Sequence, residues 1–129
     1  MMPILSALGL IGLAYLVGSI PTAYLLAKWL KGIDIRRVGS GNVGATNALR
    51  TLGLWAGLTV FAVDIAKGVV AASLLPRFVA TNPTPTMGLS CGLVAIVGHM
   101  FPWALHFKGG KGVATTIGVL LGAAPALAA

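Results

Sequence analysis

Long uncharged stretches alternate with short polar connections along the chain. Residues 1–27 carry no charged side chain, and apolar stretches follow at about 52–75, 87–107 and 113–129. A helix needs about 20 apolar residues to cross the hydrocarbon core of a membrane. The pattern therefore predicts about four membrane-spanning helices, at 3–27, 52–75, 87–107 and 113–129.

The first stretch contains an interruption. Pro21 follows Gly18 and Ser19, and we expect it to kink the helix or to end its regular part. A removable signal peptide is the alternative interpretation of this stretch. It is disfavoured because its basic residues would precede the apolar run, whereas here they follow it.

The composition supports a membrane protein. The chain is 57% hydrophobic and only 9% charged, with a mean hydropathy of +0.96, whereas a soluble domain has about a quarter charged residues. We therefore predict an all-α integral membrane protein, a polytopic transmembrane helix bundle with one membrane domain over residues 1–129.

The same composition excludes several kinds of site. A single cysteine permits no internal disulfide, and the chain has two aspartates, two histidines and no glutamate. Metal sites built from carboxylates and catalysis by paired carboxylates need more acidic residues than this. We expect no metal site and no cofactor.

The basic residues predict the orientation. Five lie in the connection 28–51 and two in 108–112, whereas the connection between the second and third spans has Arg77 alone. Basic residues in short loops mark the cytoplasmic side. We therefore expect the N-terminus outside and both glycine-rich loops, 28–51 and 108–112, in the cytoplasm. The net charge of +7 is explained in this way without a nucleic-acid partner.

The first of these loops contains GSGNVGATNALR, residues 39–50, which matches G-x-G-x-x-G. A dinucleotide site would need a preceding strand and a nearby acid. The acid at the right distance, Asp64, falls inside a predicted span, so this interpretation is disfavoured.

An anion site suits the first loop better. Its glycines let several backbone N–H groups point at one guest, and a helix starting near Ala45 would add its positive end. Arg50 can bind phosphate through two N–H groups. Neutral hydrogen-bond donors accompany it, namely Ser40, Asn42, Thr46 and Asn47. A loop whose glycines only make turns is the alternative.

The second loop, FKGGKGVATT at residues 107–116, departs from a nucleotide P-loop because Gly112 follows Lys111 where Ser or Thr is required. Lys108 and Lys111 on a glycine turn before a helix are a candidate phosphate clamp. A pair of lysines that only anchors the cytoplasmic side remains the alternative.

Polar groups and small residues inside the predicted spans have structural interpretations as well. Asp64 and Lys67 can pair one helical turn apart, and His99 is either a proton shuttle or a hydrogen-bond partner between helices. Gly88, Ser90 and Gly92 match a nucleophile elbow, but its strand and downstream acid are missing. Helix packing through G-x-x-x-G is favoured there, and also at two further glycine pairs, Gly53/Gly57 and Gly118/Gly122.

Four motifs together resemble one known family, the bacterial acyl-phosphate:glycerol-3-phosphate acyltransferases (PlsY). They are SGNVGATN with Arg50, D-x-x-K-G at 64–68, GHMFP at 98–102 and FKGGKGVAT at 107–115. The similarity runs from about Gly18 to the last residue.

The resemblance implies an inner-membrane enzyme of phospholipid synthesis. Such enzymes transfer the acyl group of acyl phosphate to the 1-hydroxyl of sn-glycerol 3-phosphate, and the products are lysophosphatidic acid and phosphate. A substrate phosphate is the implied base for the hydroxyl. The resemblance implies site residues of three kinds: catalytic residues Ser40, Arg50 and Lys111; phosphate-binding residues Gly41, Asn42, Asn47, Lys108, Gly109 and Gly110; and supporting residues Asp64, Lys67 and His99.

The chain departs from the family pattern at its end. Members run to about two hundred residues and have a third motif, H-x-x-N-x-x-R, which has no match here, so we expect a truncated chain or a shortened relative. The alternative function is a non-catalytic membrane scaffold or anionic-lipid-binding protein.

Overall fold

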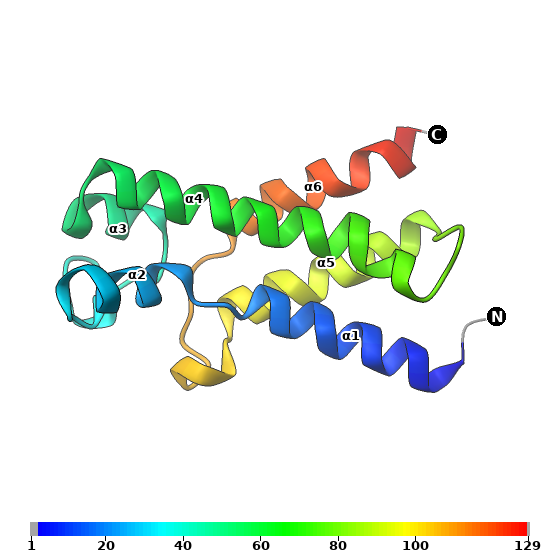
Figure 1. Ribbon diagram of the computed structural model, residues 1–129, viewed down its shortest axis with the longest axis horizontal. Helices are drawn as coiled ribbons and strands as arrows, with labels where there is room; N and C mark the ends of the chain where they lie inside the picture. The colour runs from blue at the N-terminus through cyan, green and yellow to red at the C-terminus, as the bar shows by residue number, and fades with distance from the viewer. Residues whose placement is uncertain (1–2, 129) are drawn as a thin grey trace.

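The computed structural model describes residues 3–128, and these form an all-helical fold without a β-strand (Figure 1). The α-helices are α1 (Ile4–Gly18), α2 (Thr22–Lys31), α3 (Ala45–Leu52), α4 (Leu54–Val69), α5 (Pro85–Met100) and α6 (Val113–Ala128). A π-helical segment, Val70–Leu74, extends α4, and turns of 3₁₀ helix lie at Ile35–Arg37, Leu75–Phe78 and Trp103–Leu105. The predicted all-α fold is confirmed.

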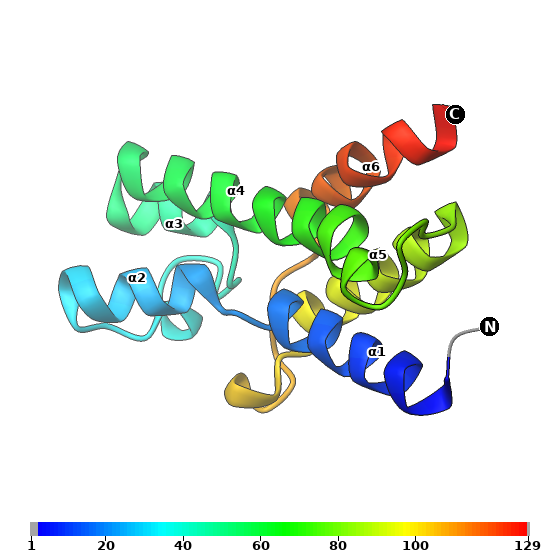
Figure 2. The same ribbon diagram turned by 45° about the vertical axis from the view of Figure 1, so that its right-hand side comes forward.

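In the described part of the chain, four longer α-helices run along the molecule and two shorter ones lie across one end. Helix α1 packs against α5, and α4 packs against both α3 and α6. Figures 1 and 2 show α2 and α3 together at the end opposite the two chain termini. Both loops predicted to bind phosphate therefore emerge away from the termini, the first between α2 and α3 and the second between α5 and α6.

The expected interruption near Pro21 is confirmed. Helix α1 ends at Gly18 and α2 starts at Thr22, because proline lacks the N–H that a continuous helix would need at this position. The first predicted span, 3–27, is thus built from two helices. Helix α2 continues to Lys31, so the basic residues of its last turn, Lys28 and Lys31, lie at the end of the molecule formed by α2 and α3.

Within residues 3–128, three segments are long and apolar enough to cross a membrane. They are Ile4–Lys31, Leu54–Phe78 and Pro85–Leu105, with mean hydropathies of 1.9, 1.9 and 1.5. Helix α6 is also apolar but has 16 residues. The count of four spans and their boundaries remain predictions.

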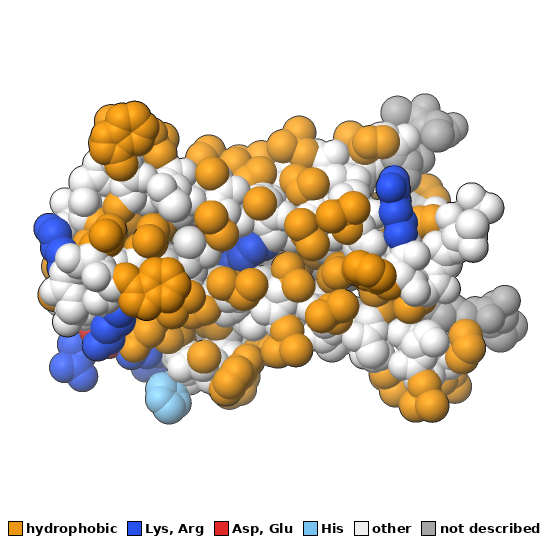
Figure 3. Space-filling model, viewed as in Figure 1, with side chains coloured by type: hydrophobic (Ala, Val, Ile, Leu, Met, Phe, Trp, Pro, Cys, Tyr) orange, Lys and Arg blue, Asp and Glu red, His pale blue; other side chains and the backbone are white. Residues whose placement is uncertain are grey.

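The outer surface of the helices is apolar. Leu5 on α1 is 82% exposed and Leu120 on α6 is 59% exposed, and Figure 3 shows hydrophobic side chains along much of the visible face. Basic side chains gather there at the end formed by α2 and α3. A largely apolar surface of this kind suits contact with lipid rather than with water.

Small residues let the long helices approach closely. A Cβ on Gly118 of α6 would collide with the backbone carbonyl of Ile65 on α4, and a Cβ on Gly92 of α5 would collide with Val119. The helix-packing interpretation is confirmed at these positions, and Ser90 lies within α5 rather than at an elbow. It is wrong for Gly53, whose φ of 102° and open surroundings make it the turn between α3 and α4.

Candidate active site

The first loop is held together by the side chain of Asn47 in α3. Its amide nitrogen donates hydrogen bonds to the carbonyls of Ile35 (3.3 Å), Val38 (3.0 Å) and Asn42 (3.0 Å), and its oxygen accepts one from the backbone N–H of Ser40 (3.2 Å). The residue is 1% exposed. Both amide hydrogens are therefore engaged, and the structure uses Asn47 to shape the loop rather than as the free phosphate ligand expected from the sequence.

The glycines of this loop allow the backbone to turn tightly. Gly39 and Gly41 have φ of 59° and 75°, a conformation that other residues rarely adopt. A Cβ on Gly41 would lie 2.9 Å from the carbonyl oxygen of Arg36. Gly41 is outside the pocket lining described below, so its role is conformational.

An ion pair braces the start of the first loop. Arg36 donates hydrogen bonds through Nε (3.0 Å) and a terminal nitrogen (2.7 Å) to the two carboxylate oxygens of Asp34, and its guanidinium stacks 5.1 Å from the ring centre of Tyr24. These hydrogen bonds lower the pKa of Asp34 to about 2 and raise the pKa of Arg36. The positive charge of Arg36 is thus neutralised by Asp34 within the loop.

The second loop folds back on the end of α5. The backbone N–H groups of Gly109 and Gly110 donate hydrogen bonds to the carbonyls of Met100 (2.9 Å) and His99 (3.2 Å). A Cβ on Gly110 would lie 2.7 Å from the carbonyl oxygen of Val43 in the first loop and 2.5 Å from Nε2 of His99. The two glycine-rich loops therefore meet beside the ring of His99.

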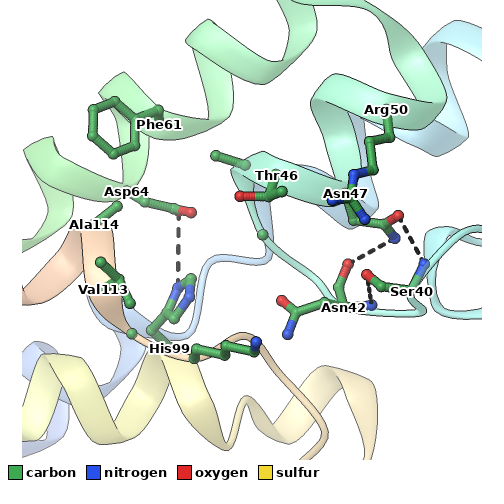
Figure 4. Close-up of a pocket in the computed structure, with 14 residues that line it drawn as sticks. Ser40, Asn42, Thr46, Asn47, Arg50, Phe61, Asp64, His99, Val113 and Ala114 are labelled. Carbon is green, nitrogen blue, oxygen red and sulfur yellow. Dashed lines mark hydrogen bonds and ion pairs between the residues drawn. The ribbon is translucent and has the colours of Figure 1, made fainter.

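A pocket of about 530 Å³ opens between these loops and the helices (Figure 4). It is lined by eight residues singled out from the sequence, namely Ser40, Asn42, Thr46, Asn47, Arg50, Asp64, His99 and Lys111. The other candidates, Gly41, Lys67, Lys108, Gly109 and Gly110, are outside this lining. Side chains from both loops thus share one cavity with polar groups of the membrane helices.

The pocket also has apolar wall residues that the sequence motifs do not indicate. They are Phe61 on α4 and Val113 and Ala114 at the start of α6. Phe61 precedes Asp64 by three residues and therefore shares its helical face, so this residue could have been found from the spacing. No sequence spacing indicates Val113 and Ala114 as pocket residues, because their position depends on how the second loop folds back.

A narrower apolar groove of about 190 Å³ adjoins the pocket. It lies between α3 and α4 and shares Ala45, Thr46 and Phe61 with the pocket, and the rest of its lining comes from Leu49, Leu54, Gly57 and Leu58. A charged cavity and an apolar groove thus share part of one wall, which suits a ligand with a polar head and an apolar tail.

Buried charges form a cluster behind the pocket. The ammonium of Lys67 lies 3.0 Å from a carboxylate oxygen of Asp64, 2.9 Å from Nδ1 of His99 and 2.9 Å from the carbonyl oxygen of Ile20. The predicted pairing of Asp64 with Lys67 is confirmed. His99 makes the predicted contact between helices, from α5 to α4. Asp64 and His99 also line the pocket, whereas Lys67 sits behind them.

Comparison with known proteins places the chain among its relatives. The family model described as glycerol-3-phosphate acyltransferase matches residues 8–129. The glycerol-3-phosphate acyltransferase of Chlorobaculum tepidum is 50% identical over 129 residues, which cover 94% of this chain and 56% of that protein. The enzyme of Bacillus velezensis is 54% identical over 118 residues, with coverages of 92% and 59%.

Solved structures give the same result. The glycerol 3-phosphate form of PlsY, an integral membrane glycerol 3-phosphate acyltransferase, has a TM-score of 0.81 and 46% identity, covering 95% of this chain and 60% of that one. The lysophosphatidic acid form has a TM-score of 0.79 and 44% identity, covering 95% and 59%. The chain thus spans less than two thirds of the length of these relatives.

The apolar helices and the likeness to PlsY together show that this is an all-α integral membrane protein with several membrane-spanning segments. The family model covers nearly the whole chain, and the motifs from which the resemblance was inferred lie within the matched residues. The chain belongs to the glycerol-3-phosphate acyltransferase family.

Proposed function

We propose that this protein transfers a fatty acyl group from acyl phosphate to the 1-hydroxyl of sn-glycerol 3-phosphate, producing lysophosphatidic acid and phosphate. The observation that carries this proposal is the shared pocket. Ser40 and Arg50 from the first loop and α3, and Lys111 from the second loop, line a single cavity. Its relatives are named glycerol-3-phosphate acyltransferases, and the solved PlsY structures are the glycerol 3-phosphate form and the lysophosphatidic acid form.

The pocket and its groove suit the two substrates. Both substrates carry phosphate, and Arg50 and Lys111 bring positive charge to the cavity lining from two separate segments of the chain. The acyl tail of the donor and product fits the adjoining groove of Leu49, Leu54 and Leu58. Gly109 and Gly110 hold the second loop against α5 rather than lining the pocket, so we assign them a conformational role.

The chemistry follows from positioning. Acyl phosphate is already activated, so the hydroxyl oxygen of glycerol 3-phosphate can form a bond to the acyl carbon while the bond from that carbon to the phosphate oxygen breaks. The hydroxyl proton leaves on a substrate phosphate. The cations hold the reactants together and neutralise charge on the departing phosphate, two contributions that are large in phosphoryl and acyl chemistry.

The proposed site belongs on the cytoplasmic face of a bacterial inner membrane. The end formed by α2 and α3 carries Lys28, Lys31 and Arg50, and both substrates are made in the cytoplasm. The positive-inside bias gives the N-terminus outside and both loops inside.

The test is turnover by the purified chain in lipid nanodiscs. Labelled glycerol 3-phosphate with palmitoyl phosphate should give lysophosphatidic acid and phosphate, whereas palmitoyl-CoA should give none. An Arg50→Ala variant should lose the product. Binding of anionic-lipid vesicles without any turnover would instead support the alternative, a non-catalytic lipid-binding protein.

A further inference from the structure

The buried ammonium of Lys67 determines which nitrogen of His99 carries a hydrogen. An ammonium has three N–H donors and no acceptor. The three neighbours of Lys67 Nζ are the Ile20 carbonyl, a carboxylate oxygen of Asp64 and Nδ1 of His99, at 2.9, 3.0 and 2.9 Å. Lys67 is 4% exposed, so water is largely kept from this cluster. Nδ1 of His99 therefore accepts, and a neutral ring must carry its hydrogen on Nε2.

The ring of His99 also borders the substrate cavity. His99 lines the pocket although Lys67 does not. Nε2 lies against Gly110 of the second loop, where a side chain would leave it no room. Among the side-chain hydrogen bonds of residues 3–125, none uses this nitrogen. Figure 4 shows the ring in the pocket wall, between Asp64 and the open space that Asn42 borders. The His99 ring thus has one N–H donor left without a side-chain hydrogen-bond partner in that part of the chain, on a residue of the cavity wall.

We propose that His99 donates a hydrogen bond from Nε2 to a phosphate oxygen of the bound substrate, and that Lys67 and Asp64 are positioning residues that fix this tautomer. The inference rests on the proposed function and deepens it. A donor fixed in place stabilises negative charge on phosphate without reorganising during the reaction. It also means that Nε2 has no lone pair to accept the glycerol hydroxyl proton, which agrees with transfer of that proton to a phosphate.

The tautomer can be read directly from the intact protein. ¹⁵N-histidine NMR on the chain in nanodiscs at neutral pH should show His99 with Nε2 protonated and Nδ1 unprotonated. The His106→Gln variant assigns the signals, because His106 lies in the turn before the second loop and outside the pocket lining. A hydrogen on Nδ1, or on both nitrogens, would overturn the proposal. Lys67→Met removes the donor to Nδ1, so His99 in this variant should show a mixture of the Nδ1–H and Nε2–H tautomers.

Titration with ligand identifies the phosphate. Adding glycerol 3-phosphate should move the Nε2 proton resonance downfield if the acceptor is that substrate, whereas a shift with a non-hydrolysable acyl phosphate analogue alone assigns the contact to the acyl donor. Inorganic phosphate serves as the smallest probe. No shift with any of the three would overturn the contact, whether or not the chain turns over. Loss of turnover with a retained shift would count against the proposed function alone.

Variants separate this role from a merely structural one. His99→Ala should weaken binding of the responding ligand about ten- to a hundredfold, the range for a hydrogen bond to a charged group. His99→Gln offers an amide N–H near the position of Nε2 and should recover much of that loss. Equal binding by the wild type and the alanine variant would overturn the proposal.

Discussion

Arg50 and Lys111 line the same pocket, although α3 carries one and the loop before α6 carries the other. Lys108 lies three residues earlier in the same loop, is exposed, and is outside the pocket lining. The sequence predicts both lysines as phosphate ligands, but the structure distinguishes them. They form a matched pair with equal charge and similar exposure.

The first prediction compares these lysines. Lys111→Ala should raise the KM or Kd for glycerol 3-phosphate about ten- to a hundredfold, because it removes a charge-assisted contact. Lys108→Ala should change it by less than about threefold, the effect of a distant surface charge. Steady-state kinetics and calorimetry would check both. Equal losses in the two variants would mean that general positive charge, rather than a defined contact, binds the phosphate.

Much of the fold follows from local sequence signals. Apolar stretches of spanning length and Pro21 indicate the helices and the break between α1 and α2, because helix length and proline geometry are local properties. The first loop is predictable as a unit for the same reason. Its glycines, Asn47 and Arg50 lie within twelve residues of one another.

The parts that could not be predicted depend on contacts between distant segments. The side chain of Asn47 donates a hydrogen bond to the carbonyl of Ile35, twelve residues away. An asparagine in a glycine-rich loop is typical of a phosphate ligand, whereas in this fold its side chain holds the loop in place. The meeting of Gly110 with Val43 depends on the path of α5 as well as on both loops. Lys67 contacts Ile20 across the break in the first span, and no spacing rule connects those positions.

The second prediction concerns the Asn47 anchor. Asn47→Asp keeps an oxygen for the Ser40 N–H but removes the donors to three backbone carbonyls. We expect the free energy of unfolding to fall by about 1–3 kcal/mol or more, since each buried acceptor left unpaired costs an amount of that order. Denaturant titration in detergent would measure it.

Asn42→Ala is the matched control for that experiment. Its backbone carbonyl accepts from Asn47, and this bond survives the substitution. Stability should therefore change little, although binding of glycerol 3-phosphate should weaken because Asn42 lines the pocket. If both variants were equally stable, Asn47 would not be the loop anchor.

The third prediction concerns the contact between α4 and α6. Gly118→Ala would drive a methyl group into the backbone of Ile65, and overpacking of this kind costs about 1–3 kcal/mol. Gly9→Ala is the control, because Gly9 lies in α1 with no atom within 4 Å of an added Cβ. Thermal unfolding should show a lower Tm for the first variant and an unchanged or slightly higher Tm for the second. A destabilised Gly9 variant together with a stable Gly118 variant would contradict this packing.

The fourth prediction concerns the pH dependence of the Asp34–Arg36 brace. The pKa of Asp34 is lowered from 3.8 to about 2, chiefly by the hydrogen bonds from Arg36. A carboxylate whose pKa is lower in the folded than in the unfolded protein stabilises the fold at pH values above its unfolded pKa of 3.8. That contribution to stability is lost as the pH falls from about 3.8 towards 2. Because the chain has two aspartates and no glutamate, carboxyl ¹³C NMR can follow this side chain directly. Arg36→Gln should raise the midpoint towards 3.8, whereas Arg37→Gln should move it only slightly, since Arg37 is the smallest of the causes. An unchanged midpoint in the Arg36 variant would show that Arg36 does not determine the charge state of Asp34.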